Sequence, residues 1–244
     1  MATNEVDGEI SLGQPRSQNV EIKQVVGQPQ GVIVGVSYER DEQGAIIYDI
    51  DSDGVPLARE GERKILGEGV PPLTLGWSNT INYKDFSLSF LIDGKFGGQI
   101  FSGTNTVTYT NGLHKTTLEG RENGLSVSGI DGATGAPFTR TVSPEFLGRY
   151  YSRVGRIAEQ FVEDADFIKF RQVSLSYSLP NRYLEKTFIN KVNVSFIASN
   201  LFYLMRSVDN IDPEAAYNVG NAQGLEYFGV PSTRSYGMSL QVTF

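Results

Sequence analysis

The sequence predicts an all-β chain: an antiparallel transmembrane β-barrel segment with long extracellular loops. Three observations predict this class. Apolar and small polar residues alternate in several segments, long and short connections follow each other in turn, and the composition suits strands and turns. The 244 residues include Gly 27, Tyr 12 and Phe 14 but only Met 3, a balance that favours strands joined by many turns.

The last ten residues alternate without interruption up to Phe244. Large apolar residues occupy every second position, and small or polar residues fill the gaps. A period of two places the two sets on opposite faces of a strand. An apolar lipid face, a polar lumen face and an aromatic residue at the water interface are typical of outer-membrane barrels. The apolar set is Tyr236, Met238, Leu240, Val242 and Phe244.

The same period predicts five strands in all, at residues 72–83, 86–95, 167–179, 191–204 and 232–244. About ten residues is the length that a tilted membrane strand needs. The first two strands are separated only by Lys84 and Asp85, which predicts a very tight turn. The alternation changes phase before Arg171, because Ile168 and Phe170 are apolar on the other parity. We expect a β-bulge or the rim of the sheet there.

The phase of each strand predicts which residues share a face. We expect one set to point toward lipid: Leu75, Trp77, Phe90, Leu175, Phe196 and Leu240. We expect another set to point toward the lumen: Ser78, Ser89, Ser176, Ser195 and Ser239. A slip of one residue in register would exchange the faces.

The connections alternate between short turns and two long loops, residues 97–162 and 206–230. Barrels have short turns at one end and long loops at the other, so substrate selectivity is expected in these loops. Ser143-Pro144-Glu145 predicts a short helix near 144–152. Residues 1–70 are expected to be loop-rich, with one hairpin formed by 31–39 and 45–50 around the turn Asp41-Glu42-Gln43-Gly44.

Composition excludes several classes of function. The net charge of −7 argues against a nucleic-acid partner. Cysteine is absent, so there is no disulfide or thiolate chemistry. No apolar run reaches the roughly 18 residues of a transmembrane helix. The first residues lack the basic and apolar segments of a signal peptide, so any export signal is expected on sequence outside this chain.

One segment has the spacing of a calcium-binding loop. Asp49, Asp51 and Asp53 alternate, Gly54 follows, and Glu60 comes six residues later, which matches the D-x-D-x-D-G-x5-E pattern. Carboxylate oxygens at alternate positions with a glycine at the turn suit Ca²⁺. Pro56 and the lack of flanking amphipathic helices favour the alternative, which is a solvated acidic turn.

Candidate catalytic residues are few. Glycosidases need two carboxyl groups about 5 to 9 Å apart, and two acidic clusters could supply them: Glu163, Asp164 and Asp166, and Asp212 and Glu214. His114 is the only histidine, which excludes a multi-histidine metal site or a histidine-based triad. Trp77 shares the parity of the apolar set, so we expect lipid or core contact instead of sugar stacking. Loop acids without a nucleophile and base indicate no enzyme and no cofactor other than the calcium above.

Five segments together resemble a known family. They read PLTLGWSNTINYKDFSLSF (72–90), DFIKFRQVSLSYSLP (166–180), ASNLF (198–202), NIDPE (210–214) and PSTRSYG (231–237). In this order they resemble the C-terminal end of the SusC/RagA-type TonB-dependent outer-membrane transporters of Bacteroidetes. Residues 25–70 resemble the preceding region of that family less specifically.

The resemblance implies the last strands of a 22-stranded barrel that imports glycans, peptides or other nutrients. Implied partners are a SusD-type surface lipoprotein, TonB through an N-terminal part, outer-membrane lipid and the barrel assembly machinery. This chain lacks a plug and the earlier strands, and five strands cannot close a wide barrel. We therefore expect a C-terminal piece that cannot transport by itself. Ser235, Gly237, Leu240, Val242 and Phe244 resemble the family's terminal assembly signal.

Two other interpretations remain open. One is a secreted β-sandwich that binds carbohydrate, and the other is a β-rich glycoside hydrolase. Both would be soluble without detergent, whereas membrane strands would aggregate.

Overall fold

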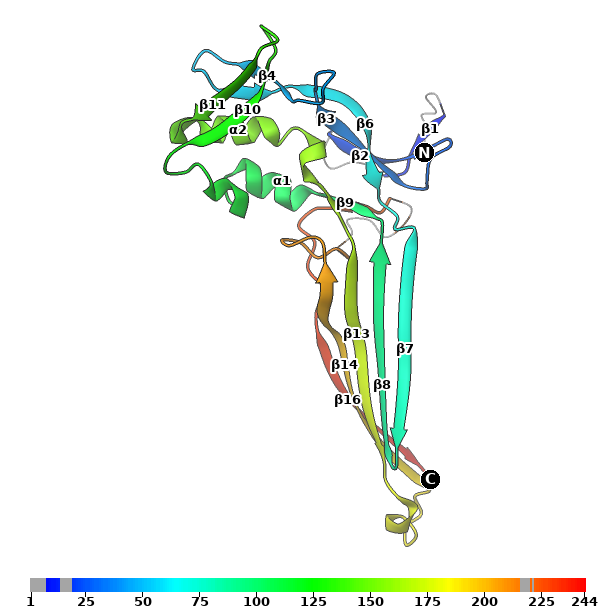
Figure 1. Ribbon diagram of the computed structural model, residues 1–244. Helices are drawn as coiled ribbons and strands as arrows, with labels where there is room; N and C mark the ends of the chain where they lie inside the picture. Colours follow the sequence, from blue (N-terminus) through cyan, green and yellow to red (C-terminus); the bar gives the residue numbers. More distant parts are fainter. Residues whose placement is uncertain (1–7, 14–18, 216–219, 221) are drawn as a thin grey trace. The chain divides into compact units, whose positions relative to one another are not determined.

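The computed structural model describes residues 8–13, 19–215, 220 and 222–244, and these are mostly β (Figure 1). The chain divides into two compact units. Unit 1 comprises Met1–Val70, Gly98–Asp164 and Ala215–Gly229, and unit 2 comprises Pro71–Gly97, Ala165–Glu214 and Val230–Phe244.

Unit 2 contains one antiparallel sheet of five long strands in the order β16-β14-β13-β8-β7 (Figure 1). The period-two pattern determines these strands, and their bounds are β7 Leu73–Tyr83, β8 Phe86–Phe96, β13 Phe167–Ser178, β14 Lys191–Arg206 and β16 Ser235–Thr243. The largest difference from the predicted ranges is the start of the last strand, at Ser235 instead of residue 232. Lys84 has a φ of 51°, a left-handed conformation that closes the two-residue turn between β7 and β8.

The phase break in β13 is a β-bulge, as predicted. Phe170 pairs with Ile92, and the next paired residue, Gln172, lies opposite Leu91. Arg171 is therefore the extra residue on β13. The neighbouring strand β14 is irregular at the same level, where Asn200 has a φ of 55°.

Unit 1 contains shorter strands in three sheets. The first has the order β1 (Glu9–Ser11), β2 (Val20–Val25), β3 (Val32–Tyr38), β6 (Glu60–Glu68). The second has the order β11 (Pro137–Val142), β10 (Leu125–Asp131), β4 (Ile47–Ile50), β5 (Pro56–Ala58), and the third β12 (Val162–Asp164), β9 (Gln99–Ser102), β15 (Leu225–Glu226).

Two α-helices belong to the described part of unit 1. The first, α1 (Gly103–Thr110), is capped by Ser102, whose hydroxyl accepts a hydrogen bond from the Asn105 amide. The second, α2 (Leu147–Val154), follows a 3₁₀ turn at Pro144–Phe146, and the predicted helix near 144–152 lies in this place. Further 3₁₀ turns are Lys115–Leu118 and Ala158–Phe161 in unit 1 and Asn181–Tyr183 in unit 2.

The core of unit 1 is closed and apolar. The first sheet contributes Ile22 and Ile33, the third sheet contributes Phe101, and α2 contributes Leu147 and Val154, all buried. Burial of this kind stabilises a fold in water by about 25 cal/mol per Å² of apolar surface.

The predicted hairpin of residues 31–39 and 45–50 is present only close to its turn. There the Asp41 and Ile47 amides donate hydrogen bonds to the Ala45 and Glu39 carbonyls, and Arg40 bridges Ile46. Farther from the turn the two runs separate, because β3 pairs with β2 and β6 whereas β4 pairs with β5 and β10. The described residues of 1–70 and 97–162 are less loop-rich than expected, because they supply strands and helices of unit 1.

No helix in the described ranges combines the length and apolar character that crossing a membrane requires.

Candidate functional site: a two-faced sheet with an ionic cluster

The register of the five long strands separates apolar from polar side chains. Residues directly opposite each other in an antiparallel pair share a face. Leu175 lies opposite Leu88 and Phe196, and Phe196 lies opposite Met238. Trp77 pairs with Ile92, Phe90 with Val173, and Leu240 with Val194. The predicted apolar set therefore lies on one face, hereafter the apolar face.

Side chains on the apolar face are largely exposed. Trp77 is 57 % exposed, Phe196 47 % and Leu240 67 %. Aromatic rings pack across neighbouring strands, with Trp77 edge-on to Phe90 at 5.1 Å between centroids and Phe170 stacked on Phe202 at 5.5 Å. A continuous exposed apolar surface of this kind marks a site of contact with lipid or with another protein.

The opposite face, hereafter the polar face, consists mainly of small hydroxyl side chains. Ser176 lies opposite Ser87 and Ser195, and Ser195 lies opposite Ser239. The hydroxyls of Ser176 and Ser195 are hydrogen-bonded at 2.8 Å. The predicted polar set, which includes Ser78 and Ser89, shares this face by register.

An ionic cluster lies on the polar face at the level of the two irregularities. The extra residue Arg171 donates to both oxygens of Asp93 and, at 2.7 Å, to Glu214. Its Nη1 also reaches Asn200 Oδ1 at 3.1 Å. The bulge therefore directs a guanidinium to the polar face, where two carboxylates and an amide bind it.

Lys169 is the most buried member of the cluster, at 1 % exposure. Its ammonium group donates to Glu214 at 2.7 Å, to Ser232 Oγ at 2.7 Å and to Tyr203 OH at 3.2 Å. All three donor positions of the ammonium are used, which a buried charge requires. Glu214 joins Lys169 to Arg171 and so joins the two cations.

Asp212 connects the loop after β14 to the segment before β16. Its carboxylate accepts hydrogen bonds from the Tyr203 hydroxyl, from the Ser232 amide at 2.7 Å and from the Glu214 amide at 2.9 Å. Burial by itself would raise the pKa of Asp212, but these hydrogen bonds outweigh it and lower the pKa to about 2. The segments NIDPE and PSTR are thus held to the same part of the polar face.

The residues proposed to bind calcium are paired with arginines. Asp49 lies 2.7 Å from Arg59, and Arg149 bridges Asp51 and Asp53 at 2.5 and 2.7 Å. Glu60 lies 3.6 Å from Arg153. Asp51 also accepts the Asp53 and Val55 amides at 3.0 and 2.9 Å, and Gly54 has a φ of +80°.

The sequence DSDG therefore folds as an Asx-type turn stabilised by Arg149. Burial would raise the pKa of Asp51, but the hydrogen bond from Arg149 and those from the two amides lower it. In the part of the chain that the structure describes, no three acidic or histidine side chains are grouped closely enough to share a metal ion. Calcium binding stays a prediction.

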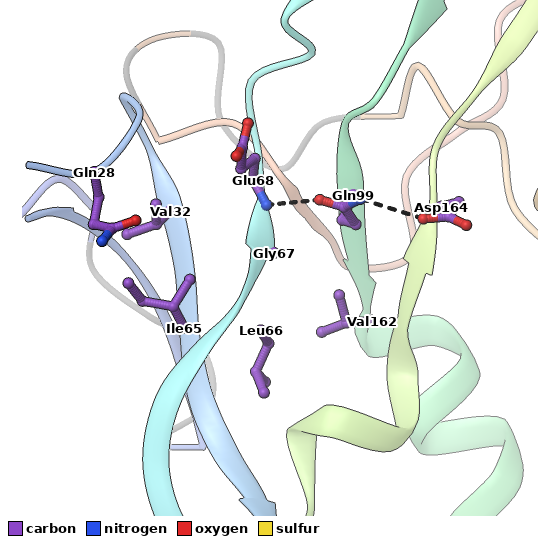
Figure 2. Close-up of a pocket in the computed structure, with 9 residues that line it drawn as sticks. All are labelled: Gln28, Val32, Ile65, Leu66, Gly67, Glu68, Gln99, Val162 and Asp164. Atoms are coloured by element: carbon purple, nitrogen blue, oxygen red, sulfur yellow. Dashed lines mark hydrogen bonds between the residues drawn. The ribbon is translucent and has the colours of Figure 1, made fainter.

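Unit 1 contains a pocket of about 460 Å³, and Figure 2 shows the residues that line it. Val32, Leu66 and Val162 contribute apolar surface. The amide of Gln99 accepts a hydrogen bond from the Glu68 backbone at 2.8 Å and donates one to Asp164 at 3.2 Å. Both ends of this amide are used within the protein, so it joins β6, β9 and β12.

The carboxylates considered for catalysis also have partners. Glu163 accepts a hydrogen bond from Asn105 at 2.6 Å, and Asp166 accepts one from the Gly97 amide at 2.7 Å. His114 caps the 3₁₀ turn at Lys115–Leu118 through its Nδ1. These contacts hold loops and helix ends in place.

Sequence reasoning missed the basic half of the ionic cluster. Lys169 and Arg171 lie in the motif at residues 166–180, and the phase break occurs at Arg171, but neither residue was predicted to belong to a site. Charged residues placed between large apolar ones in a strand are a signal that could have identified them. Asn200 and Tyr203 carried no signal of their own. Buried Glu226, 2 % exposed, was also missed in the loop 206–230, where it accepts hydrogen bonds from Ser102 and Thr104.

No family model matches this sequence. Three TonB-dependent receptors of Formosa agariphila are similar to it. Receptor P3 is 28 % identical over 223 residues, which are 88 % of this chain and 20 % of the receptor. Receptor P39 is 28 % identical over 82 % of this chain and 19 % of the receptor. Receptor P26 is 26 % identical over 84 % of this chain and 20 % of the receptor.

Solved structures show the same fold. The RagAB peptide transporter matches 97 % of this chain and 24 % of its own chain, with a TM-score of 0.57 at 18 % identity. The RagAB peptide importer in its open-open state matches 97 % of this chain and 25 % of its own, with a TM-score of 0.59 at 18 % identity.

The resemblance to SusC/RagA-type TonB-dependent receptors that the five motifs predicted is therefore confirmed. The chain spans about a fifth of the length of the curated relatives. These matched proteins are named as receptors and transporters, not as enzymes.

Proposed function

We propose that this chain forms the last membrane strands of a TonB-dependent nutrient importer of the SusC/RagA type in the outer membrane. The observation that carries the proposal is the two-faced sheet, apolar and exposed on one side and hydroxyl-rich on the other. Each of β7 and β8 has 11 residues. At about 3.3 Å per residue and a tilt of about 45°, such a strand spans about 25 Å, the height of the apolar band of an outer-membrane barrel.

The barrel class explains why the apolar face lacks a cover. A secreted β-sandwich needs a second sheet packed about 10 Å from the first. The described residues of unit 2 form a single sheet, so unit 2 supplies no second layer. Lipid chains would cover the apolar face in a membrane, and the polar face would line the lumen.

In this proposal the importer requires parts beyond the present residues. A plug, earlier strands and a TonB-contacting segment would lie on further sequence, and a SusD-type lipoprotein would bind at the cell surface. The cargo is a glycan or a peptide, and a peptide is favoured by the likeness to RagAB. The segments 97–162 and 206–230 would contribute to selectivity. Asp49, Asp51, Asp53 and Glu60 keep the role of a calcium loop as a hypothesis that their spacing motivates.

The final strand, β16, has a further proposed role, in the assembly of the barrel. β16 is an edge strand of the described sheet and pairs only with β14 there, so its other edge is free to add a strand. Gly237, Leu240, Val242 and Phe244 would be read by the barrel assembly machinery. Deleting Phe244 from the longer protein should leave unassembled protein in the periplasm. Normal surface assembly of that variant would remove this role.

The test of the importer proposal compares adjacent positions on β13 in the longer protein. Arginine at Leu175 would face lipid and should cost up to about 2–4 kcal/mol, the value at the bilayer midplane, which impairs membrane assembly. Arginine at Ser176 would face the lumen and should be tolerated. Equal assembly of Leu175→Arg and Ser176→Arg would contradict the proposal.

A further inference from the structure

One end of the unit 2 sheet differs in charge from the rest of the protein. It comprises the β7–β8 turn, the β13–β14 connection and the end of β16, hereafter the basic end. Four basic residues lie there, Lys84, Arg182, Lys186 and Lys191, against two acidic ones, Asp85 and Glu185, although the whole chain has a net charge of −7. The basic end is therefore a local exception in an acidic protein.

Exposed aromatic rings accompany these cations. Tyr83 is 68 % exposed, Tyr183 59 % and Phe188 80 %. Phe188 stacks on Phe244, with 5.7 Å between ring centroids and 15° between ring planes. Two exposed phenyl rings held together at a turn have no cover in the described part of unit 2, and burial in water-free surroundings would stabilise them.

Two of the cations are oriented by neighbouring tyrosines. The Lys84 ammonium lies 5.4 Å from the centroid of Tyr83, and the Arg182 guanidinium lies 4.8 Å from that of Tyr183. Arg182 also donates a hydrogen bond to the Tyr183 hydroxyl at 3.1 Å. These contacts place each positive charge beside an amphipathic ring that prefers the membrane–water interface.

The cations of the basic end have no carboxylate within ion-pair distance among the residues that the structure describes. Lys169 and Arg171, in the ionic cluster of the same sheet, are by contrast fully engaged with Asp93 and Glu214. The basic end thus offers positive charge to a partner, whereas the ionic cluster does not.

We propose that the basic end binds the phosphate groups of anionic phospholipids at the membrane surface, a proposal that rests on the membrane function proposed above. Lysine and arginine side chains extend along apolar surface toward headgroups while their charges stay in water. Each basic residue near an anionic bilayer contributes attraction that salt weakens. The position beside the apolar face and the exposed rings favours a lipid headgroup as the source of the phosphate.

The experiment uses the longer protein that carries this chain, reconstituted in phosphatidylcholine membranes that contain a trace of spin-labelled phosphatidylglycerol or phosphatidylcholine. Electron spin resonance measures the fraction of each labelled lipid that is immobilised by the protein. The variant Lys84→Gln/Arg182→Gln/Lys186→Gln removes three charges of the basic end. The control variant Lys64→Gln/Arg140→Gln/Arg156→Gln removes three exposed charges of unit 1, of which Lys64 and Arg156 are paired with Glu159 and Glu60.

We expect the native protein to select phosphatidylglycerol over phosphatidylcholine, by up to roughly fivefold per basic residue engaged. The triple variant of the basic end should lose most of this selectivity, and the control should keep it. Equal immobilisation of both lipids by the native protein, or unchanged selectivity in the triple variant, would overturn the inference while leaving the membrane function intact. Failure to insert in any membrane would instead overturn the proposed function and this inference with it.

Discussion

The two units of this protein expose their large apolar side chains to very different degrees. In unit 1, Ile33 and Ile157 are 0 % exposed and Phe101 is 2 % exposed. In unit 2, Trp77, Phe196 and Leu240 are each about half exposed or more. The hydrophobic effect can therefore stabilise unit 1 in water, whereas the apolar face of unit 2 gains little until an apolar phase covers it.

This difference predicts opposite responses to the loss of a phenyl ring. Phe101→Ala removes a closed-core ring and should lower the free energy of unfolding of unit 1 by about 3–5 kcal/mol. Phe196→Ala should cost unit 2 far less in a membrane or micelle, because acyl chains are as apolar as the lost ring and can fill its place. Pulse proteolysis in a denaturant series, with fragments assigned to each unit, measures both. Equal losses would contradict the comparison.

The ionic cluster is the part of unit 2 that does resemble a buried core. Glu214→Gln leaves Lys169 and Arg171 without the carboxylate that joins them, and removing one partner of a buried pair costs about 3 kcal/mol. We expect faster hydrogen exchange around Tyr203 and Ser232 and a lower free energy of unfolding. Glu185→Gln, in the exposed β13–β14 connection, is the control and should change stability by less than about 0.5 kcal/mol. Equal effects of the two variants would mean that the cluster adds no stability.

Acid should weaken the same cluster. The pKa of Asp212 is lowered from 3.8 to about 2 in the folded protein. Its contribution, about 2 kcal/mol, is therefore present above pH 3.8 and is lost as the pH falls through 2. In Asp212→Asn, the free energy of unfolding should depend less on pH between 3.8 and 2. An unchanged profile in that variant would assign the acid sensitivity to other groups.

Among these predictions, we expect the smallest effect when calcium is added or removed. Arg149 is already paired with both Asp51 and Asp53, so a bound ion would have to displace its guanidinium. If the loop does bind Ca²⁺, a calorimetric titration at millimolar concentration should show heat, and chelation should increase proteolysis at the 49–60 loop. No heat and no change in proteolysis would leave only the arginine-stabilised turn.

The long strands could be predicted from the sequence, but unit 1 could not. β7, β8, β13, β14 and β16 are each nine or more residues long, and apart from the phase break at Arg171 and Asn79 in β7 large apolar residues mark one face, so the period is readable. The strands of unit 1 are short and several pair with distant segments. β10 pairs in parallel with β4, and β15 pairs in parallel with β9. Local patterns carry no information about such pairings.

The candidate site on the unit 2 sheet was also predictable only in part, because local patterns do not show which distant residues come together. The two faces follow from parity, and the bulge at Arg171 follows from the phase break. The cluster joins Asp93, Lys169, Tyr203, Asp212 and Ser232, which are far apart in the chain, so proximity appears only once the strands are paired. The Asx turn at Asp51 and a calcium loop share the same residue pattern, and Arg149, which distinguishes them, lies nearly a hundred positions further along.

The most direct test of the central claim, that unit 2 has a lipid face and a lumen face, is a depth scan along β13. This chain contains no cysteine, so single cysteines at residues 173 to 178 of the longer protein, freed of any other cysteine, can each carry one environment-sensitive fluorophore. Brominated lipids quench fluorophores that contact acyl chains. The account predicts strong quenching at 173, 175 and 177 and little at 174, 176 and 178. Uniform quenching, or none, along these six positions would contradict it.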